Sequence, residues 1–332
     1  MSSSKAVLPD NDTVAQVFKA LETETTALLE HLDLLFLMDY PVFAPDSRGR
    51  TRVHEPPELL KGLLHCFYNE IYGPRPMARE LRNEDIWRQC GFERPPSRRT
   101  LSRFIADFGV VAEEVFIKLV HELAEQVPLG KLFRIDGTDI PVDQRDEDAK
   151  WNYDHAEDDF YYGYGCCVVT AADNIPVAAA FTPAKKVDQE TAMRVTHDAL
   201  AVESPRWMIG DSEFDMLEWH DHLLAQAVVP IAPYNPRNMA DPLDIDYRVE
   251  DRIKEHSDTV RLRQKQLDKT YSNRSQVETA IGVCKDLGLG TPRVRGRVRV
   301  KAHVFIALCL RLTVALANYH RGNDVASPNI TL

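Results

Sequence analysis

The chain has 332 residues, which is enough for about two domains at roughly 150 residues each. Hydrophobic residues make up 44% of it and charged residues 27%, a balance that excludes a disordered or membrane-embedded chain. Taken as a whole, the net charge of -11 argues against a nucleic-acid partner. The charge is uneven, however: residues 131–250 carry a net -14, whereas residues 251–332, with 15 basic and 7 acidic side chains, carry +8. The basic final segment could therefore bind a polyanion.

The sequence gives no sign of export or of membrane insertion. Its first residues contain no apolar segment, and the most apolar late stretch, residues 304–317, contains Arg311 and is shorter than the roughly 20 residues a span needs. The six cysteines form no C-x-x-C pair, and Cys166 and Cys167 lie in an apolar run, which indicates buried thiols. We expect a soluble, cytoplasmic protein with no membrane partner. The acid excess is also compatible with a high-salt cytoplasm.

The first part of the chain is expected to be entirely helical. Apolar residues recurring every three or four positions predict one helix over residues 11–40, several short helices over 56–108 and a further helix over about 109–126. Ser97 or Thr100 is placed to cap the helix that follows it. Residues 73–103 hold eight Arg against four acidic residues, so a helix-turn-helix reader is compatible with this region. Candidate DNA contacts on the reader helix, equally explained as a solvated face, are Arg98, Arg99 and Arg103.

After Gly130 the pattern changes to strands and then to alternating strands and helices. Strands are predicted at 133–140, 161–170, 176–182, 207–209 and 228–232, with helices at 188–202, 215–226, 273–287 and up to about 320. This order predicts an α/β fold with a mixed sheet and flanking helices. We expect an N-terminal helical domain at 1–128, an α/β domain at 129–322 with a polar insertion at about 234–270, and a tail at 323–332.

Three acidic residues on separate elements are candidates for chemistry. Asp136 lies inside a predicted strand, where a lone buried carboxylate is costly, although it could instead begin a turn with Gly137. Asp211 follows a short buried strand, at the edge where ligands gather in such sheets. Glu278 lies in the predicted 273–287 helix. The pair His220 and His222, two residues apart in a helix pattern, is expected to diverge into solvent.

The helix around Glu278 has two distinct faces. At 100° per residue, Tyr271, Arg274, Glu278 and Lys285 fall in one narrow polar stripe, and the apolar residues form the opposite, packing face. The stripe presents a carboxylate between an Arg and a Lys, although Arg274 and Glu278 could simply form a helix salt bridge. Converging carboxylates suit Mg²⁺, and two such ions can serve phosphoryl displacement without a nucleophilic side chain.

The spacing Tyr271, Arg274, Glu278, Lys285 resembles the Tyr-Arg-Glu-Lys pattern of one branch of the DDE transposases of bacterial and archaeal insertion sequences. Asp136 followed by Gly137 and Thr138, Asp211 followed by Phe214 and Asp215, and the stretch RPPSRRTLSRF also match that family. The resemblance spans residues 55–320. One departure is that Ser212 and Glu213 follow Asp211 where the family usually has a Lys, which leaves that local contact open.

The resemblance implies a ribonuclease H-like core preceded by a helical DNA-binding domain. It implies that Asp136, Asp211 and Glu278 hold two Mg²⁺ or Mn²⁺ ions, that Arg274 and Lys285 grip phosphates, and that Tyr271 contacts the transposon end. The implied function is a DNA transposase that binds terminal inverted repeats, cleaves a strand and joins the 3′-hydroxyl to target DNA, with a homodimer in the synaptic complex and no small-molecule substrate. The alternatives are a non-catalytic DNA-binding regulator and a nuclease of the same fold.

A basic run precedes the last helix and is interpreted as a strand. On a strand, alternating cations would all lie on one side at intervals of about 6.6 Å, a spacing that suits a phosphate backbone. The alternative is an edge strand that its charges protect from aggregation. The five cations are Arg293, Arg295, Arg297, Arg299 and Lys301.

Overall fold

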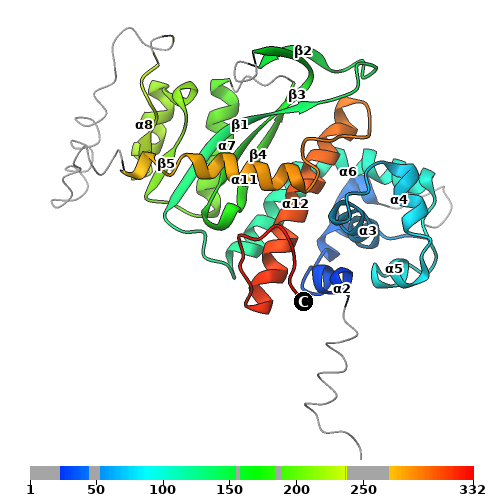
Figure 1. Cartoon of the computed structure of the whole chain (residues 1–332). Coiled ribbons are helices and arrows are strands. Elements are labelled where there is room, and N and C mark those ends of the chain that lie inside the picture. Colours follow the sequence, from blue (N-terminus) through cyan, green and yellow to red (C-terminus); the bar gives the residue numbers. More distant parts are fainter. Residues whose placement is uncertain (1–22, 45–52, 155–157, 184–187, 236, 238–268) are drawn as a thin grey trace, which may run out of the picture.

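The computed structural model describes residues 23–44, 53–154, 158–183, 188–235, 237 and 269–332. The first half of the helix expected over 11–40, and nearly all of the insertion expected at 234–270, lie outside these residues. Figure 1 shows helices α3 to α5 on one side of the molecule and the sheet on the other, with α12 between them.

The second half of the described chain contains a mixed sheet, as predicted. Its strand order is β2-β3-β1-β5-β6, and β4 pairs with β3 beyond the end of β2. Strands β1 to β4 pair antiparallel, whereas β5 and β6 continue from β1 in parallel. The bounds are β1 Leu132–Pro141, β2 Lys150–Asp154, β3 Asp159–Thr170, β4 Pro176–Thr182, β5 Trp207–Ile209 and β6 Val229–Ile231.

Strand β2 is absent from the sequence prediction. It pairs only with the first part of β3, from Lys150 opposite Gly163 to Asp154 opposite Asp159. Its residues KWNYD alternate, with Trp151 and Tyr153 between polar residues, but the run is only five residues long and Trp151 remains 58% exposed. This short pattern is the local signal for β2, and pairing with β3 holds the strand in the sheet.

Helices α7 (Gln189–Val202), α8 (Leu217–Ala225) and α11 (Ser275–Asp286) pack on this sheet. Helix α7 contacts β3 and β4, α8 contacts β6, and α11 contacts β1 and β3. The predicted packing face of α11 is confirmed, because Val277, Ala280, Ile281 and Cys284 are all buried. This face fixes α11 across the strand that carries Asp136.

The N-terminal elements correct the prediction of one long first helix. Helix α2 spans only Glu24–Leu29, and a 3₁₀ turn, η1, spans Leu35–Asp39. The Asp33 carboxylate accepts from the backbone N–H of Leu35 at 2.9 Å, a side-chain bond that competes with helix continuation. The elements that follow are the 3₁₀ turn η2 Pro41–Phe43, α3 Pro56–Tyr68, α4 Pro74–Glu80 and α5 Glu84–Gln89.

Helix α6 is a single helix of 27 residues, Arg98–Ala124, where the sequence predicted two. Ser97 caps it, accepting from the N–H of Thr100 at 3.1 Å, as expected. Gly109, at the predicted boundary, lies in the helix interior. A Cβ there would lie 2.1 Å from the carbonyl oxygen of Val298, so this glycine permits the close crossing of α6 and α12.

The basic run is not a strand, which is the main error of the sequence prediction. Gly296, at φ 87°, turns the chain, and helix α12 begins at Arg297 and continues to Arg321. Carboxylates of Asp146 and Asp148 accept from the N–H groups of Gly296 at 2.9 Å and Arg297 at 3.0 Å, satisfying donors that a helix start leaves free. In a helix, Arg299 points nearly opposite to Arg297 and Lys301, so the five cations form no one-sided track.

Helix α12 lies at the centre of the protein. By length and composition it could cross a membrane, but 89% of its most apolar window is buried inside the protein, as in a core helix. Arg311 within it is fully buried and donates to the backbone carbonyls of Asp173, Asn174 and Val325. One continuous buried cluster runs from Ala27 through α12 and the sheet to Ile330, so the N-terminal helices share a core with the α/β part. All six cysteines are free and buried, which includes Cys166 and Cys167, the two for which burial was predicted.

Candidate active site

The pairing of β1 with β5 brings the first two candidate carboxylates to the same level. Arg134 is opposite Ile209 in this parallel pair, so Asp136 and Asp211 each follow the last paired residue by two positions. Gly210 separates β5 from Asp211, and a Cβ there would lie 2.7 Å from that of Phe214. Backbone geometry therefore places both carboxylates at the end of the parallel strands, where ligands bind in such sheets.

Asp136 occupies a confined position in the middle of β1. Its side chain is only 14% exposed, and its Oδ1 accepts from the N–H of Gly137 at 2.8 Å. Burial raises the pKa of Asp136 to about 6, the Asp211 carboxylate adds to the rise, and the Gly137 N–H and the Arg274 guanidinium oppose it. Glu278 also raises this pKa, so both of the other carboxylates act electrostatically on Asp136.

Arg274 links the third carboxylate to the first. Its guanidinium lies 3.7 Å from Asp136 Oδ2 and 3.5 Å from Glu278 Oε1. The i,i+4 salt bridge considered from the sequence is therefore present, but it also reaches across to the sheet. Glu278 is 59% exposed, whereas Arg274 is 30% exposed, so the Glu278 carboxylate borders solvent above a more confined cation.

Tyr271 and Lys285 lie at opposite ends of the predicted stripe. Tyr271 precedes α11 and packs against the small apolar cluster of β5 and β6. Burial raises its pKa, and the positive charge of Arg274 opposes the rise. Lys285 is exposed in the last turn of α11, roughly 10 Å along the axis from Glu278. The structure thus gathers Tyr271, Arg274 and the carboxylates and leaves Lys285 apart.

Sequence reasoning missed Arg134, which ties β1 to the segment that carries Arg274. It is buried, and its Nε donates to the carbonyl of Asn273 at 3.0 Å. Its Nη1 donates to the carbonyl of Ala171 at 3.2 Å, and its Nη2 donates to Gln276 Oε1. An arginine inside an otherwise apolar strand, two residues before Asp136, is a sequence signal that could have identified it.

Asp215 and His220 correct a second prediction. The sequence indicated a helix N-cap at Asp215 and solvent exposure for His220, but the N-cap of α8 is Met216 and both residues are buried, with Asp215 Oδ1 3.2 Å from His220 Nε2. Asp215 Oδ2 also accepts from the N–H of Asn235 at 2.8 Å, and the Asn235 side chain donates to the carbonyl of Ser212. The loop that carries Asp211 is therefore bound to the end of β6. His222 is half-buried and is also not the free surface residue expected.

The three carboxylates of Asp136, Asp211 and Glu278 supply the oxygen donors that a divalent cation requires. Among the residues that the structure describes, no three His, Cys, Asp or Glu side chains form a complete metal-binding group. The Arg274 guanidinium lies instead against Asp136 and Glu278. Asp211 and Glu278 both act on Asp136 through their negative charges, and the Arg274 guanidinium acts on it with the opposite charge. Hard oxygen donors with excess negative charge fit Mg²⁺ or Mn²⁺.

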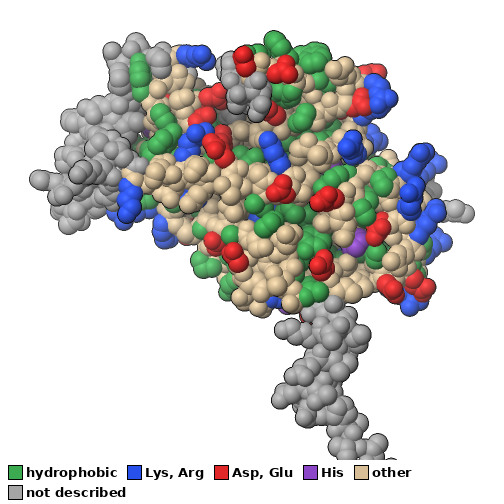
Figure 2. Space-filling view, in the orientation of Figure 1, with side chains coloured by type: hydrophobic (Ala, Val, Ile, Leu, Met, Phe, Trp, Pro, Cys, Tyr) green, Lys and Arg blue, Asp and Glu red, His purple; other side chains and the backbone are tan. Residues whose placement is uncertain are grey.

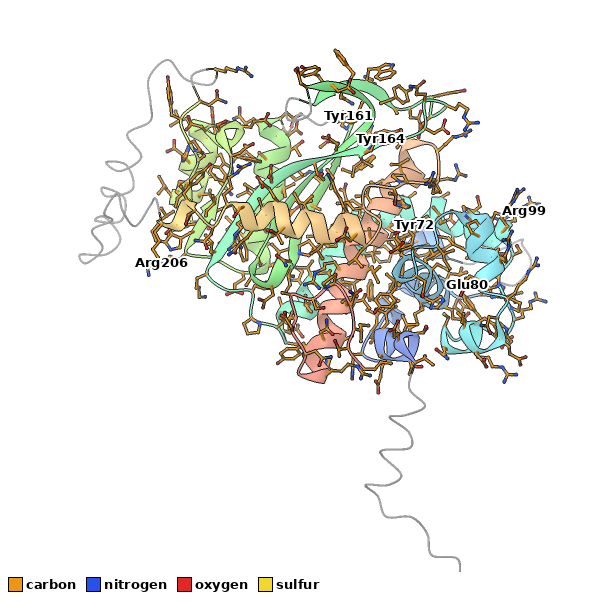
Figure 3. The ribbon with its side chains drawn as sticks, in the orientation of Figure 1. Tyr72, Glu80, Arg99, Tyr161, Tyr164 and Arg206 are labelled. Carbon is orange, nitrogen blue, oxygen red and sulfur yellow. The ribbon has the colours of Figure 1, made fainter. Side chains whose placement is uncertain are left out.

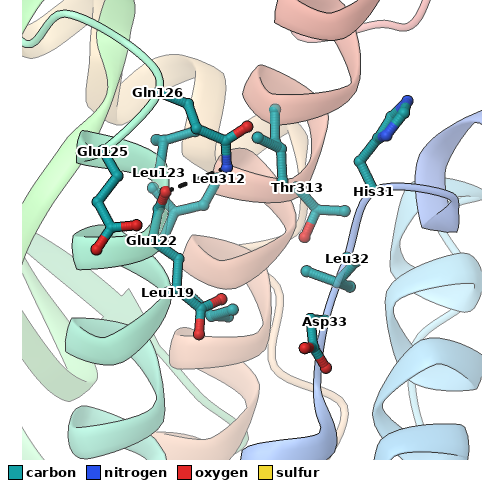
Figure 4. A pocket seen from close by; sticks show the side chains of 11 residues that line it. His31, Leu32, Asp33, Leu119, Glu122, Leu123, Glu125, Gln126, Leu312 and Thr313 are labelled. Atoms are coloured by element: carbon teal, nitrogen blue, oxygen red, sulfur yellow. Dashed lines mark hydrogen bonds between the residues drawn. The ribbon is translucent and has the colours of Figure 1, made fainter.

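The remaining predicted contacts lie away from the carboxylates. Arg98, Arg99 and Arg103 are exposed at the start of α6, and Figure 3 shows Arg99 at the outer edge of the molecule near α4. Arg293, Arg295, Arg297 and Arg299 are exposed around the start of α12, and Lys301 is half-buried. Arg295 lies 3.4 Å from Asp143, which reduces its free charge. A hollow of about 320 Å³ between α6, α12 and the segment after α2 contains none of the predicted site residues (Figure 4).

Known proteins share this chain's sequence and architecture. Residues 129–313 match a family described as "Transposase DDE domain". The chain is 53% identical over 329 residues to a protein of two Halobacterium salinarum strains described as a probable transposase for insertion sequence element ISH11, covering 99% of this chain and 100% of that protein. A solved structure of the piggyBac transposase synaptic complex with hairpin DNA is similar in fold, with a TM-score of 0.50 at 9% identity, over 92% of this chain and 77% of that one.

Proposed function

Because the chain belongs to the DDE transposase family, as its sequence pattern indicated, we propose that Asp136, Asp211 and Glu278 are its catalytic set. The substrate is the DNA at the ends of its own insertion sequence. The reaction is hydrolysis of a strand at the end, followed by attack of the freed 3′-hydroxyl on target DNA. The observation that carries the proposal is that Asp136 and Asp211 lie at the same level of neighbouring chain segments, while Arg274 lies against both Asp136 and Glu278.

The three carboxylates would hold two Mg²⁺ or Mn²⁺ ions. When bound, these ions activate the attacking oxygen and stabilise the leaving one in an in-line phosphoryl displacement. Glu278 is exposed enough to reorient its carboxylate, and Arg274 would then release it toward the two aspartates. The ribonuclease H-like type of core is part of this proposal, and the strand order β4-β3-β1-β5-β6 supports it.

The flanking side chains act on the DNA itself. Arg274 is confined beside Asp136 and would bind the phosphate next to the scissile bond, since guanidinium and phosphate form paired charge-assisted hydrogen bonds. Tyr271, held against the β5–β6 cluster, would pack on the terminal nucleotides. Lys285, exposed two turns farther along α11, would contact a more distant phosphate. Two copies would pair the two ends as a homodimer.

Substitution Asp136→Asn tests the catalytic set. We expect loss of Mg²⁺-dependent nicking of DNA carrying the element end, while the affinity for that end stays within about twofold, because Asn keeps the shape and removes one charge. Asp286→Asn, an exposed change on the same helix as Glu278, is the matched control and should leave nicking intact. Equal loss of binding and nicking in Asp136→Asn would refute a catalytic role. A wild-type chain that binds without nicking would be a regulator, and nicking without a joined product would identify a nuclease.

A further inference from the structure

A basic groove lies between α4 and the start of α6, away from the carboxylates. It is a hollow of about 460 Å³ lined by Arg75, Arg79, Arg82 and Arg98, with Ala78, Pro95, Pro96 and Ser97 as its other walls. No acidic residue lines it. Figure 2 shows Lys and Arg side chains gathered along the edge of the molecule where α4 lies. We call these four residues the arginine groove.

The four guanidinium groups carry uncompensated charge. All four residues are exposed, and no ion pair or hydrogen bond joins their side chains to any other residue that the structure describes. Of the four acidic residues in this part of the chain, Glu80 lies 3.6 Å from His65 and Glu84 pairs with Arg88. The other two, Asp85 and Glu93, do not line the groove. Like charges in one hollow repel one another, so the groove favours an anion that spans it.

The groove is held in shape by its backbone. Pro74 and Pro76 occupy the first turn of α4, and Pro95 and Pro96 lead into α6, each fixing its own φ. Arg75 and Arg79 are four residues apart in α4 and therefore share one face, with Arg82 just beyond the helix end. A rigid frame loses less entropy when its side chains bind a ligand.

We propose that the arginine groove binds the phosphate backbone of duplex DNA without reading its sequence, as a second contact remote from the cleavage site. The chain as a whole is net -11, so its approach to a polyanion depends on local cationic surfaces, and the lining of this one contains four arginines and no acidic residue. Phosphate contacts of this kind set position and orientation, whereas base contacts set specificity. The inference rests on the proposed function only in taking DNA as the substrate.

The test compares the full-length wild type with the triple variant Arg75→Ala/Arg79→Ala/Arg82→Ala on a random-sequence duplex and on an element-end duplex. We expect the slope of log affinity against log salt to fall by about 3 and the affinity at 0.1 M salt to fall at least about tenfold, equally for both duplexes. Arg88→Ala, an exposed arginine paired with Glu84 outside the groove, should leave both quantities unchanged. Replacing the same three arginines by Lys should retain most of the slope.

The outcomes separate this inference from the proposed catalytic role. An unchanged salt slope in the triple variant, or a wild type that binds no random duplex at low salt, overturns the groove proposal even if nicking is normal. Loss confined to the element end overturns it too, because it indicates base readout. A groove that binds poly-glutamate more tightly than DNA indicates an acidic protein partner instead. If the triple variant loses salt slope and affinity as expected but the wild type shows no nicking, only the catalytic proposal is refuted.

Discussion

Arg134 Nε donates a hydrogen bond of 3.0 Å to the backbone carbonyl of Asn273, the residue next to Arg274. A buried guanidinium on β1 thus sets the position at which the segment leading into α11 meets the sheet. Because Asp136 lies two residues after Arg134 on the same strand, one side chain fixes the first carboxylate's strand relative to the helix of the third. Arg134 is a positioning residue with no predicted contact to DNA.

Replacing Arg134 by Met should slow nicking at saturating DNA by roughly 10- to 100-fold, as loss of supporting hydrogen bonds around a metal site typically does. The carbonyls of Asn273 and Ala171 would lose their donor while the apolar stem is retained. The measurement is the single-turnover nicking rate as a function of Mg²⁺ and Mn²⁺ concentration. A purely structural role would leave the metal dependence unmoved and contradict the prediction. The control is Lys131→Ala, which removes an exposed ion pair with Glu203 directly before β1 and should leave nicking unchanged.

The Asp215–His220 contact should stabilise the loop that carries Asp211. In Asp215→Asn, a buried side chain that accepts from the Asn235 N–H and faces His220 loses part of its acceptor capacity, so we expect about 1–3 kcal/mol of destabilisation. Urea unfolding measures it. The double variant with His220→Gln should cost less than the two single changes added together, because the residues share one contact. Strict additivity would show that the contact contributes nothing.

Two glycine-to-alanine changes inside helices should change the free energy of unfolding in opposite directions. Gly109→Ala places a methyl group 2.1 Å from the Val298 carbonyl oxygen, and forcing α6 from α12 should destabilise the fold by about 1–3 kcal/mol. Gly282→Ala, in α11, meets nothing within 4 Å and should stabilise by up to about 1 kcal/mol through helix propensity. The two melting temperatures, measured side by side, decide this, and a stabilised Gly109→Ala variant would refute the close crossing.

His303 should make folding stability depend on pH. It lies in α12 beside Phe67 and Tyr72, and its Nε2 donates to the Gly288 carbonyl at 2.7 Å. Burial lowers its pKa from 6.5 to about 4, so the unfolded chain binds the proton more readily than the folded one does. The contribution of neutral His303 to folding stability is complete above pH 6.5. It is lost as the pH falls toward 4, at up to about 1.4 kcal/mol per pH unit.

Urea midpoints at pH 7 and pH 5 measure this effect. The His303→Gln variant keeps a donor for Gly288 but does not titrate. Its urea midpoint should therefore differ less between pH 7 and pH 5 than that of the wild type. If the variant and the wild type lose the same stability on acidification, other buried groups account for it.

The sequence determined the elements whose pattern is local. Apolar periodicity placed β1, β3 to β6, α7, α8 and the packing face of α11, and the spacing of Tyr271, Arg274 and Glu278 indicated the family that the comparisons then showed. The individual roles of these residues remain predictions. Short-range pattern is informative here because the helices bury one apolar face on the sheet, whereas β4, β5 and β6 are short apolar runs that are buried throughout.

Tertiary structure decided the rest, because those features depend on partners distant in the chain. The run after Pro292 alternates like a strand, but Asp146 and Asp148 cap a helix there, about 150 residues away in sequence. The local pattern predicts that a helix ends at Gly109. The glycine instead lies inside one long helix, because a side chain there would collide with the carbonyl of Val298 in α12. Asp215 and Arg134 are polar residues that only a folded neighbourhood could satisfy. The negative whole-chain charge likewise concealed a cationic groove that forms only when α4 meets α6.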